Sequence, residues 1–170
     1  MKAIIYIAFF LISASAFAQT ALDSIVLKKA NEYRDSLCLP KLEFSRTCFA
    51  AAESQAAFQM KDLSKITHDQ NGSDIGDRYK KASGSSRFGF VGEIIAACGK
   101  NFRDSDSLIN EKIAYALIEQ WKSSKDHNAI LTSPRMKYAG ASVLIVVSKM
   151  GIRGWTRYDI RGVMVLSDTK

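Results

Sequence analysis

The sequence has no long apolar run beyond its first twenty residues. A membrane-spanning helix needs about 20 consecutive apolar residues, so we expect no transmembrane segment in the mature chain. The first residues differ, because Lys2 precedes an apolar run that ends at the small-residue site Ala16-Phe17-Ala18. This pattern is typical of a secretory signal peptide. We predict a signal peptide over residues 1–18 and one exported domain over residues 19–170, either secreted or periplasmic.

The sequence also lacks a cluster of basic residues. The formal net charge is +7 at pH 7, but the lysines and arginines are distributed along the whole chain. This distribution favours a solvated basic surface over a nucleic-acid site, so we expect no nucleic-acid partner.

There are only three cysteines, Cys38, Cys48 and Cys98. No two of them have the spacing of two to four residues that a zinc knuckle requires. An oxidising compartment favours one disulfide, with one thiol left over, and the sequence does not identify the pair. The alternative is three reduced thiols that pack as small buried side chains.

Apolar residues recur at helical spacing in four parts of the chain. Pro40 ends the first of these, because proline has no amide hydrogen and holds its neighbour extended. Asp106 or Ser107 is suited to cap the last. We expect helices over residues 21–37, 45–63, 75–82 and 107–121.

Strand patterns dominate the end of the chain. Residues 139–147 form a continuous apolar run rich in valine, which predicts a central strand, and residues 155–166 alternate as a hairpin partner would. Residues 90–98 are consistent with a buried strand or a short helix, and residues 101–107 with a polar turn. Helices followed by strands predict an α+β domain in which helices pack on a mostly antiparallel sheet.

Two histidines and one carboxylate stand out as candidate site residues. The Ser-Lys-Asp run after Trp121 is suited to end a helix and leave His127 in an exposed, irregular segment. His68 lies in another polar segment, and Glu93 lies among apolar residues. Only folding would bring these three residues together.

Four motifs follow one another along the chain: Leu39-Pro40-Lys41-Leu42, His68 before a glycine-containing loop, Gly92-Glu93-Ile94-Ile95, and Trp121-x-x-Ser124-x-x-His127. In type and order they resemble the CAP superfamily, which is named for cysteine-rich secretory proteins, antigen 5 and pathogenesis-related 1 proteins. The resemblance is strongest to its short bacterial secreted members and covers the chain from about Ala21 to Leu166.

The resemblance implies a three-layer α-β-α sandwich with a cleft lined by two histidines and two glutamates. In some members this cleft holds a divalent metal, often zinc. His68 and His127 take the places of the two histidines and are the implied metal ligands, and Glu93 takes that of the first glutamate. Ser124 stands where many members have the second glutamate, and Ile94 where an asparagine is usual.

The chemistry of these residue types allows two interpretations. Two neutral imidazoles are acceptable zinc ligands, and Glu93 could act as a general base or hold an imidazole in place. However, a catalytic zinc generally has three protein ligands, and Ser124 offers only a neutral hydroxyl. In the alternative interpretation Glu93 accepts hydrogen bonds from one or both histidines in a buried polar network that needs no cofactor.

Other reactive groups give weaker hypotheses. Ser123 or Ser124 with His127 lacks the sharp turn and the orienting acid of a serine hydrolase. Cys48 and Cys98 lie in apolar surroundings, which raise a thiol pKa and so disfavour a nucleophile.

The arginines give only structural expectations. Arg157 and Arg161 share a strand face, which we expect to be solvated rather than an anion site. Arg78 is expected to pair with Asp74 or Asp77 at helical spacing.

Three functional hypotheses follow. The first, which we favour, is an exported non-catalytic binding or interaction module that engages a lipid, a glycan or a partner protein at the cell envelope. The resemblance supports it, because family members are linked to sterol and lipid binding. The second is a weak divalent-metal-dependent hydrolase that uses His68, Glu93 and His127. The third is a structural envelope protein in which these residues are only architectural.

Overall fold

The computed structural model describes residues 19–170, so the predicted signal peptide lies outside the described residues. Within the described part the chain forms five helices and four strands. No helix of this part combines the length and the apolar character that crossing a membrane requires. The elements, in chain order, are α1 (Ala21–Ser36), β1 (Glu43–Phe44), α2 (Arg46–Gln59), α3 (Ile75–Ser83), β2 (Val91–Arg103), α4 (Ile109–Ser123), α5 (Lys125–Leu131), β3 (Tyr138–Lys149) and β4 (Trp155–Ser167).

The four strands form one sheet in the order β1-β3-β4-β2. β4 is antiparallel to both β2 and β3, and the short β1 is parallel to β3. The sheet is therefore mixed, with its long strands antiparallel, which confirms the mostly antiparallel sheet that the sequence predicts. β2 is an edge strand, and this position matters for the site described below.

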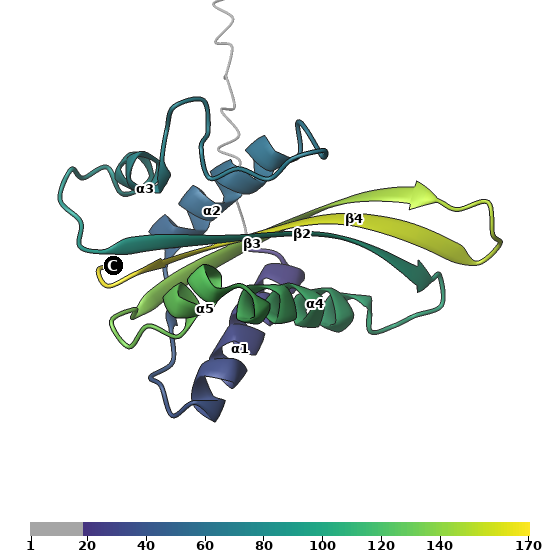
Figure 1. The fold of residues 1–170 in the computed structure, drawn as a ribbon, viewed down its shortest axis with the longest axis horizontal. Coiled ribbons are helices and arrows are strands. Elements are labelled where there is room, and N and C mark those ends of the chain that lie inside the picture. The colour runs from purple at the N-terminus through teal and green to yellow at the C-terminus, as the bar shows by residue number, and fades with distance from the viewer. Residues whose placement is uncertain (1–18) are drawn as a thin grey trace, which may run out of the picture.

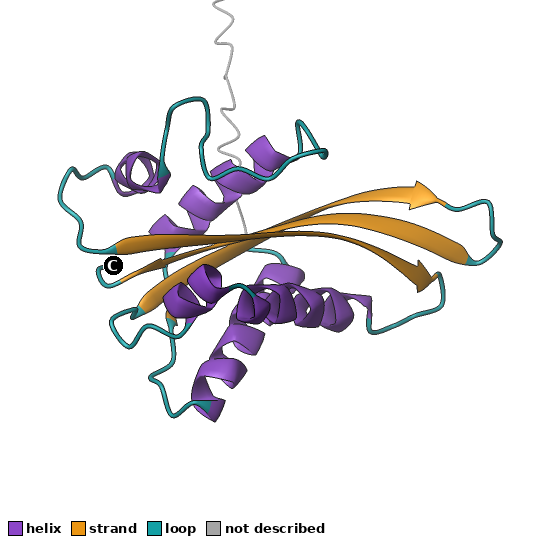
Figure 2. Cartoon of the chain, viewed as in Figure 1, coloured by secondary structure: helices purple, strands orange, loops and turns teal. Residues whose placement is uncertain are grey.

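Helices cover both faces of the sheet (Figure 1). α2 and α3 lie on one face, whereas α1, α4 and α5 lie on the other (Figure 2). Because side chains alternate across a strand, each long strand supplies apolar residues to both helical layers. Ile94 packs with the α1, α4 and α5 side, and its neighbour Ile95 packs with the α2 and α3 side. The α-β-α sandwich implied by the resemblance is confirmed.

Two glycines allow the helices to approach the sheet closely. A Cβ atom on Gly140 of β3 would lie 2.1 Å from the backbone nitrogen of Phe49 in α2. A Cβ atom on Gly92 of β2 would lie 2.8 Å from a methyl group of Ile130 in α5. Gly92 therefore allows α5 to lie against the residue next to Glu93.

Several boundaries differ from the sequence predictions. α2 ends at Gln59 rather than near residue 63, and β2 is a strand that continues through residues 101–103, where we predicted a turn. These residues remain in the strand because they pair with Trp155–Arg157 of β4. α4 begins at Ile109 after Leu108, without the side-chain cap expected from Asp106 or Ser107.

The three cysteines form no disulfide. Cys38 is exposed after α1, Cys48 is buried in α2, and Cys98 is half-buried on β2. No two cysteines are close enough to form the predicted disulfide in this fold, and of the three only Cys48 is fully buried as the alternative expected. Burial raises the pKa of the Cys48 thiol to about 11, which keeps it protonated and unreactive at neutral pH.

Candidate functional site

The loop that follows α2 brings His68 to Glu93 on the edge strand β2. The His68 Nδ1 atom lies 2.9 Å from Glu93 Oε1. Because a carboxylate only accepts hydrogen bonds, the Nδ1–H of His68 is the donor. The Glu93 side chain is 1% exposed, whereas the His68 side chain is 54% exposed. Glu93 is thus the buried end of this pair, and His68 is its contact with solvent.

The second oxygen of Glu93 is occupied by Arg78, which the sequence analysis assigned to another partner. Arg78 Nη2 donates to Glu93 Oε2 at 2.6 Å, and both side chains are almost fully buried. Arg78 Nη1 also donates to the carbonyls of His68 and Ser73, so the same guanidinium fixes the loop that carries His68. The expected pairing of Arg78 with Asp74 or Asp77 is wrong. Asp74 instead caps α3 by accepting from the Asp77 amide.

His127 reaches the site from the other helical layer, on α5. We predicted that the chain after α4 would be irregular there, but Ser124 ends α4 and begins α5 as its N-cap, with its hydroxyl accepting from the His127 amide at 3.5 Å. His127 therefore lies in the first turn of a helix. The Ser124 side chain caps this helix rather than replacing the carboxylate that many CAP proteins have at this position.

The rings of His68 and His127 lie next to each other, with 5.8 Å between their centroids and their planes tilted by 59°. Burial lowers the pKa of His127 below its ordinary value of 6.5, and the nearby His68 lowers it further, while Asp126 acts in the opposite direction. His127 is therefore neutral at pH 7. A neutral imidazole beside an exposed imidazole offers hydrogen-bonding groups to a ligand without adding charge.

The side chains of this cleft offer few ligands for a metal ion. No group of three or more His, Cys, Asp and Glu side chains within residues 19–170 is arranged to hold a metal ion. The Glu93 side chain is 1% exposed and both its oxygens accept hydrogen bonds from protein donors, and Ser124 is a cap, so the two imidazoles are the main candidate ligands of this cleft among residues 19–170. This set does not fit a zinc site with three protein ligands. Zinc binding by His68 and His127 is what the resemblance implies, and this donor set argues against a site of micromolar strength.

Neither serine of this segment is arranged as a nucleophile. Ser123 Oγ donates to the Gln120 carbonyl within α4, and Ser124 Oγ caps α5. The serine-hydrolase hypothesis has no support in this geometry, because no base within residues 19–170 lies in position to activate either hydroxyl.

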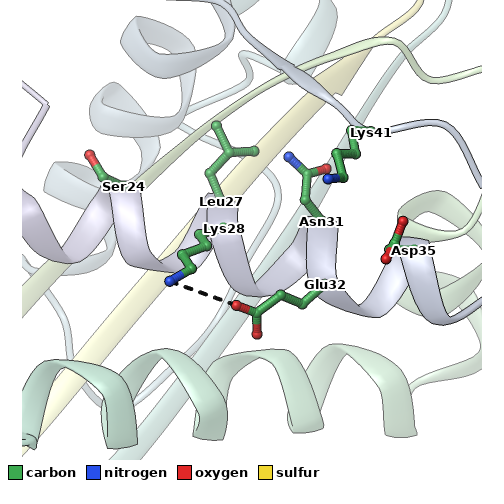
Figure 3. Close-up of a pocket in the computed structure, with 7 residues that line it drawn as sticks. All are labelled: Ser24, Leu27, Lys28, Asn31, Glu32, Asp35 and Lys41. Carbon is green, nitrogen blue, oxygen red and sulfur yellow. Dashed lines mark ion pairs between the residues drawn. The ribbon is translucent and has the colours of Figure 1, made fainter.

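A pocket of about 440 Å³ lies along α1 (Figure 3). It contains none of the predicted site residues. Its charged groups are exposed, and Lys28 and Glu32 pair across it at 4.0 Å. Asn31 bonds to the Leu42 backbone. These contacts account for the polar groups of the pocket through ordinary helix-surface interactions.

The fold and the site together define a class: an α-β-α sandwich in which two histidines from opposite helical layers meet a buried glutamate at a sheet edge. A family model described as the cysteine-rich secretory protein family, CAP, matches residues 27–146. The chain belongs to this family. A comparison with curated proteins finds no match.

Solved bacterial structures are similar in fold. An outer surface protein from Borrelia burgdorferi has a TM-score of 0.62 at 20% identity, over 90% of this chain and 96% of that one. An extracellular protein containing an SCP domain from Bacillus anthracis has a TM-score of 0.57 at 17% identity, over 86% of this chain and 40% of that one. A cysteine-rich secretory protein from Staphylococcus aureus has a TM-score of 0.51 at 12% identity, over 86% of this chain and 38% of that one. At these identities the likeness concerns the fold.

Sequence reasoning identified His68, Glu93 and His127, and the structure brings all three together. It missed Arg78, whose guanidinium neutralises Glu93. The signal available was the apolar context of Glu93, since a buried carboxylate needs a cation or several donors nearby.

Proposed function

We propose that the protein is an exported, non-catalytic binding module of the CAP family that acts at the cell envelope or outside the cell. Its ligand is a lipid, a glycan or a segment of a partner protein. The outer-surface and extracellular proteins among the similar structures support this location.

One observation carries the proposal: Glu93, the group best suited for chemistry, has both oxygens engaged by Arg78 and His68. A general base needs a free lone pair that faces the substrate. Arg78 occupies the second oxygen from within the buried pair, and the Glu93 side chain is only 1% exposed, so the carboxylate does not face a substrate. The arrangement therefore supports a rigid recognition surface formed by the two imidazoles.

The test is a binding survey with two-dimensional NMR on residues 19–170. Soluble peptidoglycan fragments and vesicles of phosphatidylcholine with and without phosphatidylglycerol serve as probes. We expect at least one probe to perturb the His68 and His127 signals, and the perturbation to be lost in the His68→Ala/His127→Ala variant. Ser123→Ala is the matched control, because the Ser123 hydroxyl bonds only within α4.

A second candidate, the weak metal-dependent hydrolase, is favoured by the 5.8 Å separation of the two imidazole rings. Zinc-dependent turnover of an ester or peptide, lost in Glu93→Gln, would establish it and overturn the binding proposal. A loss of stability in the histidine variant with no ligand found would instead favour the structural envelope protein.

A further inference from the structure

Arg161 lies on β4, on the sheet face that α2 and α3 partly cover, and only 5% of its surface is exposed. We expected a solvated residue here, and this expectation is wrong. The loop after α2 covers Arg161, because the Leu63 carbonyl accepts a hydrogen bond from Arg161 Nη2. A fully charged guanidinium is thus held out of water.

The donors of Arg161 are incompletely used. A guanidinium has five N–H donors. Arg161 donates from Nη2 to Leu63 and from Nη1 to the carbonyl of its own neighbour, Ile160, at 3.1 Å. Its Nε–H is buried and has no hydrogen-bond partner within residues 19–170. No carboxylate in that part of the chain forms an ion pair with it.

Arg34 shows how this fold satisfies a buried arginine with no ligand. It is 0% exposed and also lacks a carboxylate partner among the described residues. Its three nitrogens donate to four backbone carbonyls at 2.7 to 3.3 Å, those of Pro40, Leu131, Ser133 and Met136. Arg161 has half as many carbonyl partners, so its buried charge is left poorly compensated.

A pocket of about 430 Å³ opens beside Arg161, between the loop after α2 and the uncovered part of β2 and β4. Its lining residues include three cations, Lys65, Arg157 and Arg161, and one carboxylate, Asp159. A Cβ atom on Gly99 would lie 2.5 Å from Arg157 Nη2, so the glycine allows that guanidinium to lie flat across β2. Arg157 already forms an ion pair with Asp159 at 2.8 Å, and Lys65 forms one at 3.1 Å with Asp62, which lies outside the pocket lining. Arg161 is therefore the cation of this lining that has no carboxylate partner among residues 19–170.

We propose that this pocket binds a phosphate group, with Arg161 as its buried anchor and Arg157 and Lys65 at its rim. Guanidinium donors match phosphate oxygens in geometry and form strong, charge-assisted hydrogen bonds with them. The phosphate supplies the counter-charge that no residue of the described chain supplies. The phosphate site shares no residue with the His68 and Glu93 cleft, so its test is independent of the test of the proposed function.

The experiment follows the arginine Nε–H signals of residues 19–170 by NMR while inorganic phosphate replaces chloride at constant ionic strength. We expect a saturable shift of the Arg161 signal and none of the Arg34 signal. Arg161→Gln is expected to weaken phosphate binding about tenfold or more, as the loss of a charge-assisted hydrogen bond implies. Arg157→Gln and Lys65→Gln are each expected to weaken phosphate binding about threefold. Both change exposed side chains, so they test the site even if Arg161→Gln fails to fold.

Arg153→Gln is the matched control, since Arg153 is an exposed arginine outside the pocket, and we expect no change in it. No saturable shift at Arg161, or an equal loss in Arg153→Gln and Arg157→Gln, would overturn the proposal and leave only general charge attraction. Sedimentation with phosphatidylcholine vesicles that contain phosphatidic acid then identifies the source. If the protein co-sediments with these vesicles and Arg161 is required, the phosphate belongs to a lipid headgroup. If the protein binds inorganic phosphate but does not co-sediment, the ligand is a soluble phosphate. Either result supports the site.

Discussion

Two buried arginines donate hydrogen bonds to the loop after α2, and they differ in whether a carboxylate compensates their charge. Arg78 holds the end of the loop near His68 and Ser73, and it pairs with Glu93 at 2.6 Å. Arg161 holds the beginning of the loop at Leu63, and it has no carboxylate partner within residues 19–170. A buried cation with its counter-charge built in forms a closed structural unit. A buried cation without a counter-charge, such as Arg161, is stabilised when it binds an anion from solution.

The largest effect is expected for Glu93→Gln, which leaves the Arg78 charge buried and unpaired. We predict a loss of about 3–5 kcal/mol in the free energy of unfolding, measured by urea denaturation. Asp77→Asn is the control: Asp77 also pairs with a cation, Lys80, at 3.6 Å, but both side chains are about half exposed, so its loss should stay below about 1 kcal/mol. Equal losses of unfolding free energy in Glu93→Gln and Asp77→Asn would show that the buried Arg78–Glu93 pair contributes no more than an exposed surface pair.

A smaller effect is expected for Arg78→Lys, which keeps the charge but loses the planar fork. An ammonium group cannot reach Glu93 and both loop carbonyls with the geometry that Arg78 has. We predict a loss of about 1–3 kcal/mol, together with increased hydrogen exchange in residues 68–73. Unchanged exchange there would show that Arg78 does not hold the loop. Lys80→Arg, an exposed change on the same helix, is the control.

Arg161→Met tests whether the buried Arg161 lacks a compensating charge, in contrast to Arg78. Because Arg161 has no built-in partner among the described carboxylates, an apolar replacement should change the free energy of unfolding by less than about 1 kcal/mol in phosphate-free buffer, or raise it. Arg34→Met, which strands four buried carbonyls, should cost more than about 2 kcal/mol. A loss above about 3 kcal/mol in Arg161→Met would mean that protein groups already compensate its charge.

The smallest effect concerns the pH dependence of His127. Its pKa is lowered in the folded protein, mainly by burial, so the unfolded chain binds more protons as the pH falls below the ordinary histidine value of 6.5. The contribution of His127 to stability is fully present above that value and is lost as the pH falls through its lower folded-state pKa. His127→Gln should therefore show a smaller decrease in melting temperature between pH 7.5 and pH 5 than the unmodified protein. A steeper decrease of the melting temperature in the variant would contradict a lowered pKa of His127 in the folded protein.

Local patterns in the sequence predicted what depends on periodicity. The first helix and the β3-β4 hairpin follow from apolar spacing, whereas the helical layers on both faces of the sheet were implied by the resemblance. The motif order located His68, Glu93 and His127. Arg78 was misassigned because Asp74 and Asp77 offer partners at helical spacing, whereas its actual partner Glu93 is 15 residues away.

Arg161 was misjudged for a related reason. It alternates with apolar residues along β4 as a solvated side chain would, and only the tertiary position of the loop after α2 buries it. β2 extended further than predicted because β4 pairs with its polar end, and pairing between distant segments leaves no local signal. The missed features are therefore contacts that exist only in the folded chain.

Arg78 and His68 occupy both oxygens of Glu93, and we propose that the cleft therefore binds a ligand rather than catalysing a reaction. The most direct test is calorimetric titration of the metal-stripped protein with zinc at neutral pH, beside the His68→Ala/His127→Ala variant. We predict no zinc binding of micromolar strength that depends on the two histidines. Micromolar or tighter binding, about −8 kcal/mol or better, in the unmodified protein alone would contradict this account and establish a metal site.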